Sequence, residues 1–529
     1  MHRRLCSDNG AIPGGAGIGI AVMSLKGVLK MFAAFFMSQG VSVVNQLLVP
    51  PLFLGRYPHG VEMYGEWVAL TAAVSYLATL NFGVLNYANN EMTLLYNRGE
   101  QDAAKVVQSS ALRLILIMVL IATAIGAIFL FVPVAKWMGL RHVSSSVAGL
   151  TLFLMALQLV ATWLFAFLSN SYQVTGELHR GTNWQNAQRL TAVLAMAALL
   201  WIRASFPVLA LSQFAIMVLY AAIVLVELRV RAPILVPSLH YGNRHDLIAV
   251  LKPSAYYGLF AFSAFFCWQG PVLLIQKILG PAAVAVFALS RVVFNMARQL
   301  LIILTYSIGQ ETIHLIARRS WAQLRRMYDL SERVVLALVP VLTVGVLLAC
   351  PAIFAVWLRH DRSLYVPSVC MLMAIISAVM GVREHKYAFQ NLSNEHEGVA
   401  RFSLIAYGGM IAVSAVTLKT WGVTAFLVCW LAAELAILVY VVAQNQKLFP
   451  AEFRPSLSPL PRVVIVLVLV FGAAWWPVQH DGGWPLGRVI VVAVGTGLAL
   501  AFINFFTFGM KDVQDVFVSR FRRRFASDT

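Results

Sequence analysis

The sequence predicts an all-α polytopic membrane protein, and three observations lead to this fold class. Of the 529 residues, 60% are hydrophobic and only 12% are charged, whereas a soluble domain carries roughly 25% charged residues. The mean hydropathy is +0.78. Fourteen apolar windows are close in length to the about 20 residues that a helix needs to cross the hydrocarbon core of a bilayer. Lys and Arg residues are also unevenly shared between successive loops, as in chains that cross a membrane repeatedly.

The fourteen windows divide most of the chain into expected membrane-spanning helices. They cover residues 30–54, 66–86, 112–133, 147–173, 187–203, 207–227, 254–279, 282–309, 333–358, 366–390, 402–418, 422–443, 463–479 and 488–509. Because the number of crossings is even, both termini are expected on the same side of the membrane.

The distribution of basic residues predicts which side that is. With the N-terminus inside, 29 of the 40 Lys and Arg residues fall in inner segments and 9 in outer ones. This asymmetry follows the positive-inside rule, so both termini are expected in the cytoplasm. It also accounts for the net charge of +18 without a nucleic-acid partner. The segment Arg383-Glu384-His385-Lys386 is assigned to a solvated inner loop.

A weak internal repeat predicts the domain organisation. At an offset of 217–220 residues, a triplet after the fourth window matches one after the tenth: Gln173, His179 and Gly181 with Gln390, His396 and Gly398. A six-helix unit ends on the side where it began, so its copy enters the membrane in the same orientation. The prediction is therefore two six-helix lobes related by a pseudo-twofold axis along the membrane normal, plus two C-terminal helices. The expected parts are a disordered or over-extended N-terminus (1–22), an N-lobe (23–230), a C-lobe (231–445), a Pro-rich cytoplasmic linker (446–462), two further helices (463–509) and a basic tail (510–529).

Two arginines inside the eighth window are the strongest functional signal. A central arginine costs about 2.5–3.5 kcal/mol on insertion scales. Arg291 and Arg298 are seven residues apart, so they share one helix face about 10 Å apart, with Asn295 between them. One interpretation is a cationic stripe that lines a wet cavity for an anionic substrate. The other is that each arginine pairs with a buried acid or with backbone carbonyls.

Polar residues in the first and seventh windows supply further candidates. Asn45 and Gln46 extend a stripe begun by Ser38 and Ser42 along one face of the first helix. This stripe predicts either substrate contacts or hydrogen bonds between helices. Lys277, near the outer end of the seventh window, either reaches the interface or joins the cavity.

Two further features suggest movement and coupling. Gly270 and Pro271 lie near the centre of the seventh window, and proline bends a helix. The bend is either a gate or a static kink. Glu434 is interpreted as the only acid near the middle of an expected helix. It either carries a proton or pairs with a buried arginine.

Nothing in the sequence indicates an enzyme. The outer loops are short, with Asp361 and Asp481 as their only aspartates, which argues against a membrane polymerase or glycosyltransferase. No Walker A motif and no zinc-like cysteine spacing is present. No catalytic residue, metal ligand or cofactor is therefore assigned.

Several short motifs resemble those of bacterial polysaccharide and O-antigen flippases (Wzx-type), a family of the multidrug/oligosaccharidyl-lipid/polysaccharide (MOP) exporter superfamily. The resemblance runs from Met23 to about Gln444. Its motifs are Met23-Ser24-Leu25-Lys26, Val49-Pro50-Pro51-Leu52, Met63-Tyr64-Gly65-Glu66-Trp67, Leu80-Asn81-Phe82-Gly83 and Arg98-Gly99-Glu100. The family usually carries an acid where Asn81 stands here.

The resemblance implies a flippase of the bacterial inner membrane. Such proteins move undecaprenyl-pyrophosphate-linked oligosaccharide repeat units, for O-antigen, capsule or exopolysaccharide, between leaflets by alternating access. Partners implied are the lipid-linked substrate, membrane lipids, and polysaccharide polymerase and chain-length proteins. A cation-coupled multidrug exporter and a peptidoglycan-precursor flippase of the same superfamily are the alternatives.

Overall fold

The computed structural model of the chain is helical throughout its described part. It describes residues 25–507 apart from 82, 308–311, 313–314, 317–318, 359–363, 394–396 and 480–485. The N-terminus 1–22, the tail 510–529 and His396, which were named above, lie outside the described residues. Within the described part no residue is in a β-strand. The predicted fold class, an all-α polytopic membrane protein, is confirmed.

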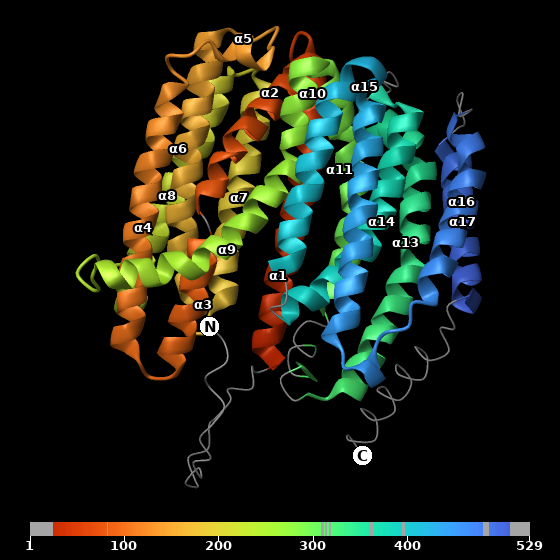
Figure 1. Ribbon diagram of the computed structural model, residues 1–529. Helices are drawn as coiled ribbons and strands as arrows, with labels where there is room; N and C mark the ends of the chain where they lie inside the picture. Colours follow the sequence, from red (N-terminus) through yellow and green to blue (C-terminus); the bar gives the residue numbers. More distant parts are fainter. Residues whose placement is uncertain are drawn as a thin grey trace.

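The first half of the chain forms a bundle of six long helices with short helices at its ends (Figure 1). In it α6 packs along α8, α1 along α7, and α4 along α6. The elements are α1 (Leu25–Arg56), α2 (Gly60–Ser75), η1 (Leu77–Asn81), α3 (Val84–Asn97), α4 (Gln101–Ile128), α5 (Val134–Met138), α6 (Ser145–Asn170), η2 (Ser171–Gln173), α7 (Leu178–Trp201), α8 (Phe206–Arg231) and η3 (Pro233–Leu235).

The second half forms a matching bundle, with α14 packed between α11, α13 and α15. Two further helices, α16 and α17, pack on α13 at the edge of this bundle (Figure 1). The elements are α9 (Arg244–Trp268), α10 (Gly270–Ile278), α11 (Pro281–Ser307), α13 (Trp321–Trp357), α14 (Pro367–Leu392), α15 (Glu397–Leu448), η5 (Ala451–Phe453), α16 (Pro459–Gln479) and α17 (Leu486–Thr507).

Helix starts in the two bundles recur at a nearly constant offset. Gly60 begins α2 and Pro281 begins α11, 221 positions later. The corresponding offsets are 219 for α1 and α9, 220 for α4 and α13, 222 for α6 and α14, and 219 for α7 and α15. Equal order and spacing of helices is what an internal duplication produces. The weak sequence repeat therefore marked a repeat that the helices follow throughout, which divides the molecule into an N-lobe and a C-lobe.

The molecule has two ends, which serve as reference points below. The "α5 end" holds α5 and the turns that precede α2, α8 and α11, and is uppermost in Figure 1. The "α3–α4 end" holds the turn between those helices and lies at the bottom. Within the described residues, eight helices are long and apolar enough to cross a membrane by length and composition.

Two of the fourteen windows, 66–86 and 254–279, contain a helix break, and the second breaks between α9 and α10. Window 66–86 was wrong as a single span, because α2 ends at Ser75 and η1 and α3 follow. The hydroxyls of Thr71 and Ser75 bond carbonyls one turn back, at 2.9 Å each, and such bonds bend helices. Gly83, with φ 70°, then lies directly before α3 and separates it from η1. Windows 402–418 and 422–443 are both within α15, which is interrupted only at Gly422 (φ 64°).

The expectation for Arg383 to Lys386 was also wrong. These residues belong to α14, and His385 and Lys386 are buried. Lys386 pairs with Glu332 of α13 and donates to the Tyr328 hydroxyl at 2.9 Å. The segment looked like a loop because four consecutive residues are polar, but polar side chains from α11, α13 and α15 pair with them inside the lobe.

The lobes touch at the α5 end through a close approach of α2 and α11. A Cβ placed on Gly65 would lie 2.0 Å from the carbonyl oxygen of Pro281. Only glycine permits this separation of the two backbones. Gln276 of α10 also donates to the Gly139 carbonyl at 3.1 Å. The α5 end is therefore one place where the two lobes are joined; α9 also packs on α3 and α4 of the N-lobe.

Candidate substrate chamber

A cavity of about 500 Å³ lies where the N-lobe meets α11. Arg291 is the one charged residue among its lining residues. The N-lobe supplies most of the remaining polar groups, which come from α1, α2, α6 and α8: Asn45, Gln46, Tyr64, Trp67, Thr71, Ser75, Gln158, Thr162 and Gln213. The C-lobe adds Gln269, which lies between α9 and α10. The structure thus brings Arg291 together with Asn45 and Gln46, as the cavity interpretation expects.

A second hollow of about 760 Å³ continues this cavity into the N-lobe. The two share Asn45, Gln158, Thr162, Met196 and Gln213, so we treat them together as the "chamber". Eight carboxamides line it: Asn45, Gln46, Gln158, Asn170, Gln185, Gln188, Gln213 and Gln269. Among the described lining residues there are two arginines, Arg189 and Arg291, and no carboxylate. The chamber is therefore polar and cationic.

The local sequence explains how α1 presents its polar face. Ser42 and Gln46 are one turn apart, and the Gln46 amide donates to the Ser42 hydroxyl at 3.2 Å. This bond fixes the side chain, while Gln46 Oε1 has no partner in the described structure. A buried acceptor without a partner costs about 1–3 kcal/mol, so a donor in the chamber, such as a hydroxyl, would be stabilised there.

Arg291 is held in the chamber by a helix break. Helix α9 ends at Trp268, and α10 starts at Gly270 with Pro271 in its first turn. The last carbonyls of a helix lack intrahelical partners, and the Trp268 carbonyl accepts a hydrogen bond from the Arg291 guanidinium. That guanidinium also lies 5.2 Å from the centroid of the Phe287 ring. Both contacts are neutral, so the positive charge of Arg291 remains available to an anion.

Arg298 lies in a different environment, so the expectation of one cationic stripe was wrong. It donates to Asn295 Oδ1 at 2.8 and 3.1 Å and pairs with Glu384 at 3.3 Å. Neither Arg298 nor Asn295 lines the chamber. The alternative reading, pairing with a buried acid, describes Arg298.

Glu434 completes an ionic network on the same side of α11. It pairs with Arg383 at 2.8 Å and accepts from the Tyr407 hydroxyl at 2.8 Å and the Trp430 indole at 3.0 Å. Arg383 also pairs with Glu384 at 3.0 Å. The network thus contains two arginines and two glutamates. Glu434 is not the only buried acid, because Glu66 and Glu332 are also buried in helices.

Lys277 does not join the chamber. Its amine donates to the Lys136 carbonyl at 3.3 Å, and it lines a separate hollow of about 220 Å³ at the α5 end. Gly270 and Pro271 lie at the break between α9 and α10.

Arg189, at the start of window 187–203, was not predicted as a site residue. Arg189 stands twelve residues into α7 and donates to the Ser38 hydroxyl at 2.9 Å. The glutamines of α6, α7 and α8 were missed with it. The sequence feature that could have identified them is the number of carboxamide side chains, such as Gln158 and Gln213, in otherwise apolar windows.

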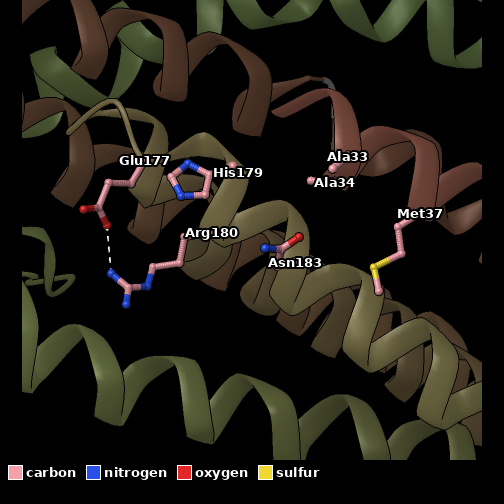
Figure 2. A pocket seen from close by; sticks show the side chains of 7 residues that line it. All are labelled: Ala33, Ala34, Met37, Glu177, His179, Arg180 and Asn183. Carbon is pink, nitrogen blue, oxygen red and sulfur yellow. Dashed lines mark hydrogen bonds and ion pairs between the residues drawn. The ribbon is translucent and has the colours of Figure 1, made fainter. Parts of the chain in front are cut away.

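A third hollow, of about 700 Å³, lies between α1 and α7, near the α3–α4 end. Figure 2 shows Ala33, Ala34 and Met37 of α1 facing His179 and Asn183 of α7, with Glu177 paired to Arg180 beside them. Along α1 the lining residues then continue from Val41 to Pro50 into the chamber. The three hollows thus follow one seam, between α1 and α7, from the α3–α4 end to Arg291.

Comparison with known proteins adds the fold family. No family model and no curated protein sequence matches the chain. Among solved structures, it is similar to the lipid II flippase MurJ in an inward closed conformation (TM-score 0.67, 9% identity, covering 93% of this chain and 100% of that one). It is also similar to an inward-facing multidrug resistance MATE family transporter of the MOP superfamily (TM-score 0.63, 11% identity, 80% and 98% covered). The chain therefore shares its fold with these two solved membrane transporters.

A third similar structure is the MATE multidrug transporter DinF-BH (TM-score 0.57, 14% identity, 80% and 97% covered). These neighbours are flippases and transporters. At such identities the likeness concerns the fold, so the choice of substrate depends on the chamber itself.

Proposed function

We propose that the protein is a flippase for undecaprenyl-pyrophosphate-linked oligosaccharides in a bacterial inner membrane. The observation that carries the proposal is the chamber, in which Arg291, Arg189 and eight carboxamides are among the described lining residues and no carboxylate is. Guanidinium groups match the oxygens of a pyrophosphate. Carboxamides both donate and accept hydrogen bonds, as sugar hydroxyls require. The MOP fold supplies two lobes that can rock about such a site.

The proposed path follows the seam between α1 and α7. The glycan enters the N-lobe part of the chamber, with Asn45 and Gln46 bonding its hydroxyls. The pyrophosphate binds Arg291 at the edge of the chamber, and the polyprenyl tail remains in lipid. The α3–α4 end is cytoplasmic in this proposal, in agreement with the basic bias of its loops, so the headgroup is taken up there.

The charge of the chamber separates this proposal from a multidrug exporter. Cationic drugs are stabilised by carboxylates, and the described chamber lining has none. The acids of the C-lobe, Glu384 and Glu434, are already paired with arginines. A peptidoglycan-precursor flippase shares the pyrophosphate chemistry and stays the alternative, to be distinguished by the glycan.

The test is transport by the purified chain in proteoliposomes. Fluorescent undecaprenyl-pyrophosphate oligosaccharides of different glycans are placed in one leaflet, and their appearance in the other is followed with a membrane-impermeant quencher. We expect Arg291→Ala to slow transport about 10- to 100-fold, because a charged hydrogen bond is worth about 1.5–3 kcal/mol. Arg291→Lys should retain part of the activity, since it keeps the charge but loses the fork.

Arg244→Ala is the matched control, because Arg244 is exposed and outside the chamber. Equal transport by Arg291→Ala and Arg244→Ala would overturn the role of the chamber. Transport of a cationic dye, without movement of any lipid-linked sugar, would overturn the function. Preference for a peptidoglycan precursor over repeat units would select the alternative.

A further inference from the structure

Two histidines and a glutamate from separate segments meet at the α5 end. The ligand atoms of His59, Glu62 and His142 all lie within 4.8 Å of one another. The rings of His59 and His142 are stacked, with centroids 4.7 Å apart and planes inclined by 21°. The two histidines are 83 positions apart in the chain, so the tertiary fold creates this cluster. It lies in the turns at the end of the bundle, away from the chamber.

The cluster is held in place before any ligand arrives. His59 has φ 52° and ψ 44°, in the left-handed region, and directly precedes α2. The next residue, Gly60, packs so tightly that an added Cβ would lie 2.6 Å from the Phe53 carbonyl oxygen. Strained conformations of non-glycine residues persist where the surrounding structure determines them. The His59 ring is therefore directed by the turn between α1 and α2.

A buried carboxylate fixes His142 over the same helix. Glu66, fully buried, accepts hydrogen bonds from the backbone amides of Arg141 at 2.5 Å and His142 at 2.9 Å. Glu62 is one turn before Glu66 on α2, so the two point to the same side. The bond to Glu66 therefore seats the loop that carries His142 beside Glu62.

The three side chains can still receive an ion. The His59 side chain makes no capping bond at the start of α2. All three side chains are exposed or half-buried, so an ion from solvent can reach them. Two imidazoles and one carboxylate are a ligand set that zinc uses, with a fourth position left for water. Imidazole also binds other first-row metals such as Co²⁺ and Ni²⁺.

We propose that His59, Glu62 and His142 form a binding site for a divalent transition metal of the zinc class. The metal would tie the turn before α2 to the loop after α5. That loop also faces the C-lobe, because the Arg141 guanidinium lies against Gly280, where an added Cβ would be 3.0 Å from Nη2. Metal binding would thus stiffen the contact between the two lobes at the α5 end. This site is independent of the proposed transport function.

The test is metal binding by the full-length chain, purified in detergent, without an affinity tag and washed with chelator. Titration with Co²⁺, followed by calorimetry and visible absorption, should show one equivalent bound, with d–d bands of a four- or five-coordinate ion. Zn²⁺ should displace it and raise the melting temperature. His142→Ala and His59→Asn should each weaken binding at least about tenfold. Asparagine is chosen at position 59 because it tolerates the left-handed backbone.

His245→Ala is the control, since His245 is exposed and near the α3–α4 end. It should bind metal as the parent chain does. The proposal is overturned if the parent binds no stoichiometric metal at micromolar concentrations. It is also overturned if the His59→Asn/His142→Ala double variant, with an unchanged melting temperature in chelator, binds as tightly as the parent.

Discussion

Arg291 and Arg298 show how one helix can carry the same side chain for two purposes. Both lie on α11, seven residues apart, and both are partly buried. Arg291 has neutral partners, the Trp268 carbonyl and the Phe287 ring. Arg298 has a carboxylate, Glu384 of α14, at 3.3 Å. The partners that the neighbouring helices supply therefore decide the role of each arginine. Arg291 can bind an anionic ligand, whereas Arg298 forms an ion pair that stabilises the lobe.

The ionic network around Arg298 predicts an unusual stability series. Glu384→Gln leaves Arg298 and Arg383 with a single carboxylate, Glu434, so an uncompensated positive charge stays largely buried. Breaking such a pair by removing one partner is strongly destabilising, whereas removing both is close to neutral. We expect Glu384→Gln to lower the melting temperature by several degrees. The double variant Arg298→Gln/Glu384→Gln should recover most of the loss, as measured by scanning fluorimetry in detergent.

The double variant supplies the decisive comparison, because it removes more hydrogen bonds than the single one. If hydrogen bonds rather than charge balance hold the network, it will melt at or below the temperature of Glu384→Gln. That order would contradict the electrostatic explanation.

At this scale the sequence could place residues on faces but could not pair them. The seven-residue spacing correctly puts Arg291 and Arg298 on related faces of one helix. It contains no information on Glu384, which seemed to be in a loop because Arg383 to Lys386 are all polar. Only the register of α14 against α11 reveals that this polar stretch is inside the lobe.

At the scale of whole elements, the contact between α2 and α11 joins the two lobes at the α5 end. A methyl group on Gly65 would lie 2.0 Å from the Pro281 carbonyl oxygen, which is backbone and cannot rotate away. We expect Gly65→Ala to destabilise the protein by about 1–3 kcal/mol, the usual cost of overpacking. It should also separate the lobes at the α5 end, where spin labels on α5 and on α15 near Gly422 would report a longer distance.

Gly345→Ala is the matched control for this prediction. Gly345 lies inside α13, and an added Cβ there meets nothing within 4 Å. Alanine is the better helix former by about 1 kcal/mol, so this variant should melt at or above the parent temperature. Equal melting temperatures for Gly65→Ala and Gly345→Ala would show that α2 and α11 can adjust freely.

The sequence predicted where helices lie better than where those helices break. Every apolar window overlaps a helix of the described chain, because about 20 apolar residues have few alternatives in a bilayer. The breaks depended on single residues. Gly270 and Pro271 marked the end of α9 in advance, since proline lacks an amide. The boundary between windows 402–418 and 422–443 falls beside the break at Gly422. Gly83 was not recognised, because an isolated glycine in an apolar run is common and only its φ identifies a break.

Across the whole molecule, the repeat connects sequence to mechanism. Two lobes with the same helix order enclose a chamber that is not symmetric, since all but one of its carboxamides come from the N-lobe, whereas Arg291 and Gln269 come from the C-lobe. The C-lobe interior is instead occupied by its ionic network. Duplication thus explains the shared architecture, and divergence of the two interiors explains why the described chamber is lined mainly by the N-lobe.

The direction of transport depends on which end faces the cytoplasm, and this can be tested with two cysteines. Glu100 is exposed at the α3–α4 end, and Trp137, 58% exposed, lies in α5 at the other. Of the described native cysteines, Cys267, Cys350 and Cys370 are buried and Cys429 is half-buried, so the parent chain should label weakly. We expect a membrane-impermeant maleimide to label Trp137→Cys in cells with a permeabilised outer membrane. Glu100→Cys should react only after the inner membrane is opened, because the positive-inside rule holds its basic neighbours in the cytoplasm. The reverse pattern would place the entrance of the α1–α7 seam outside, and uptake of a cytoplasmic precursor through it would then be ruled out.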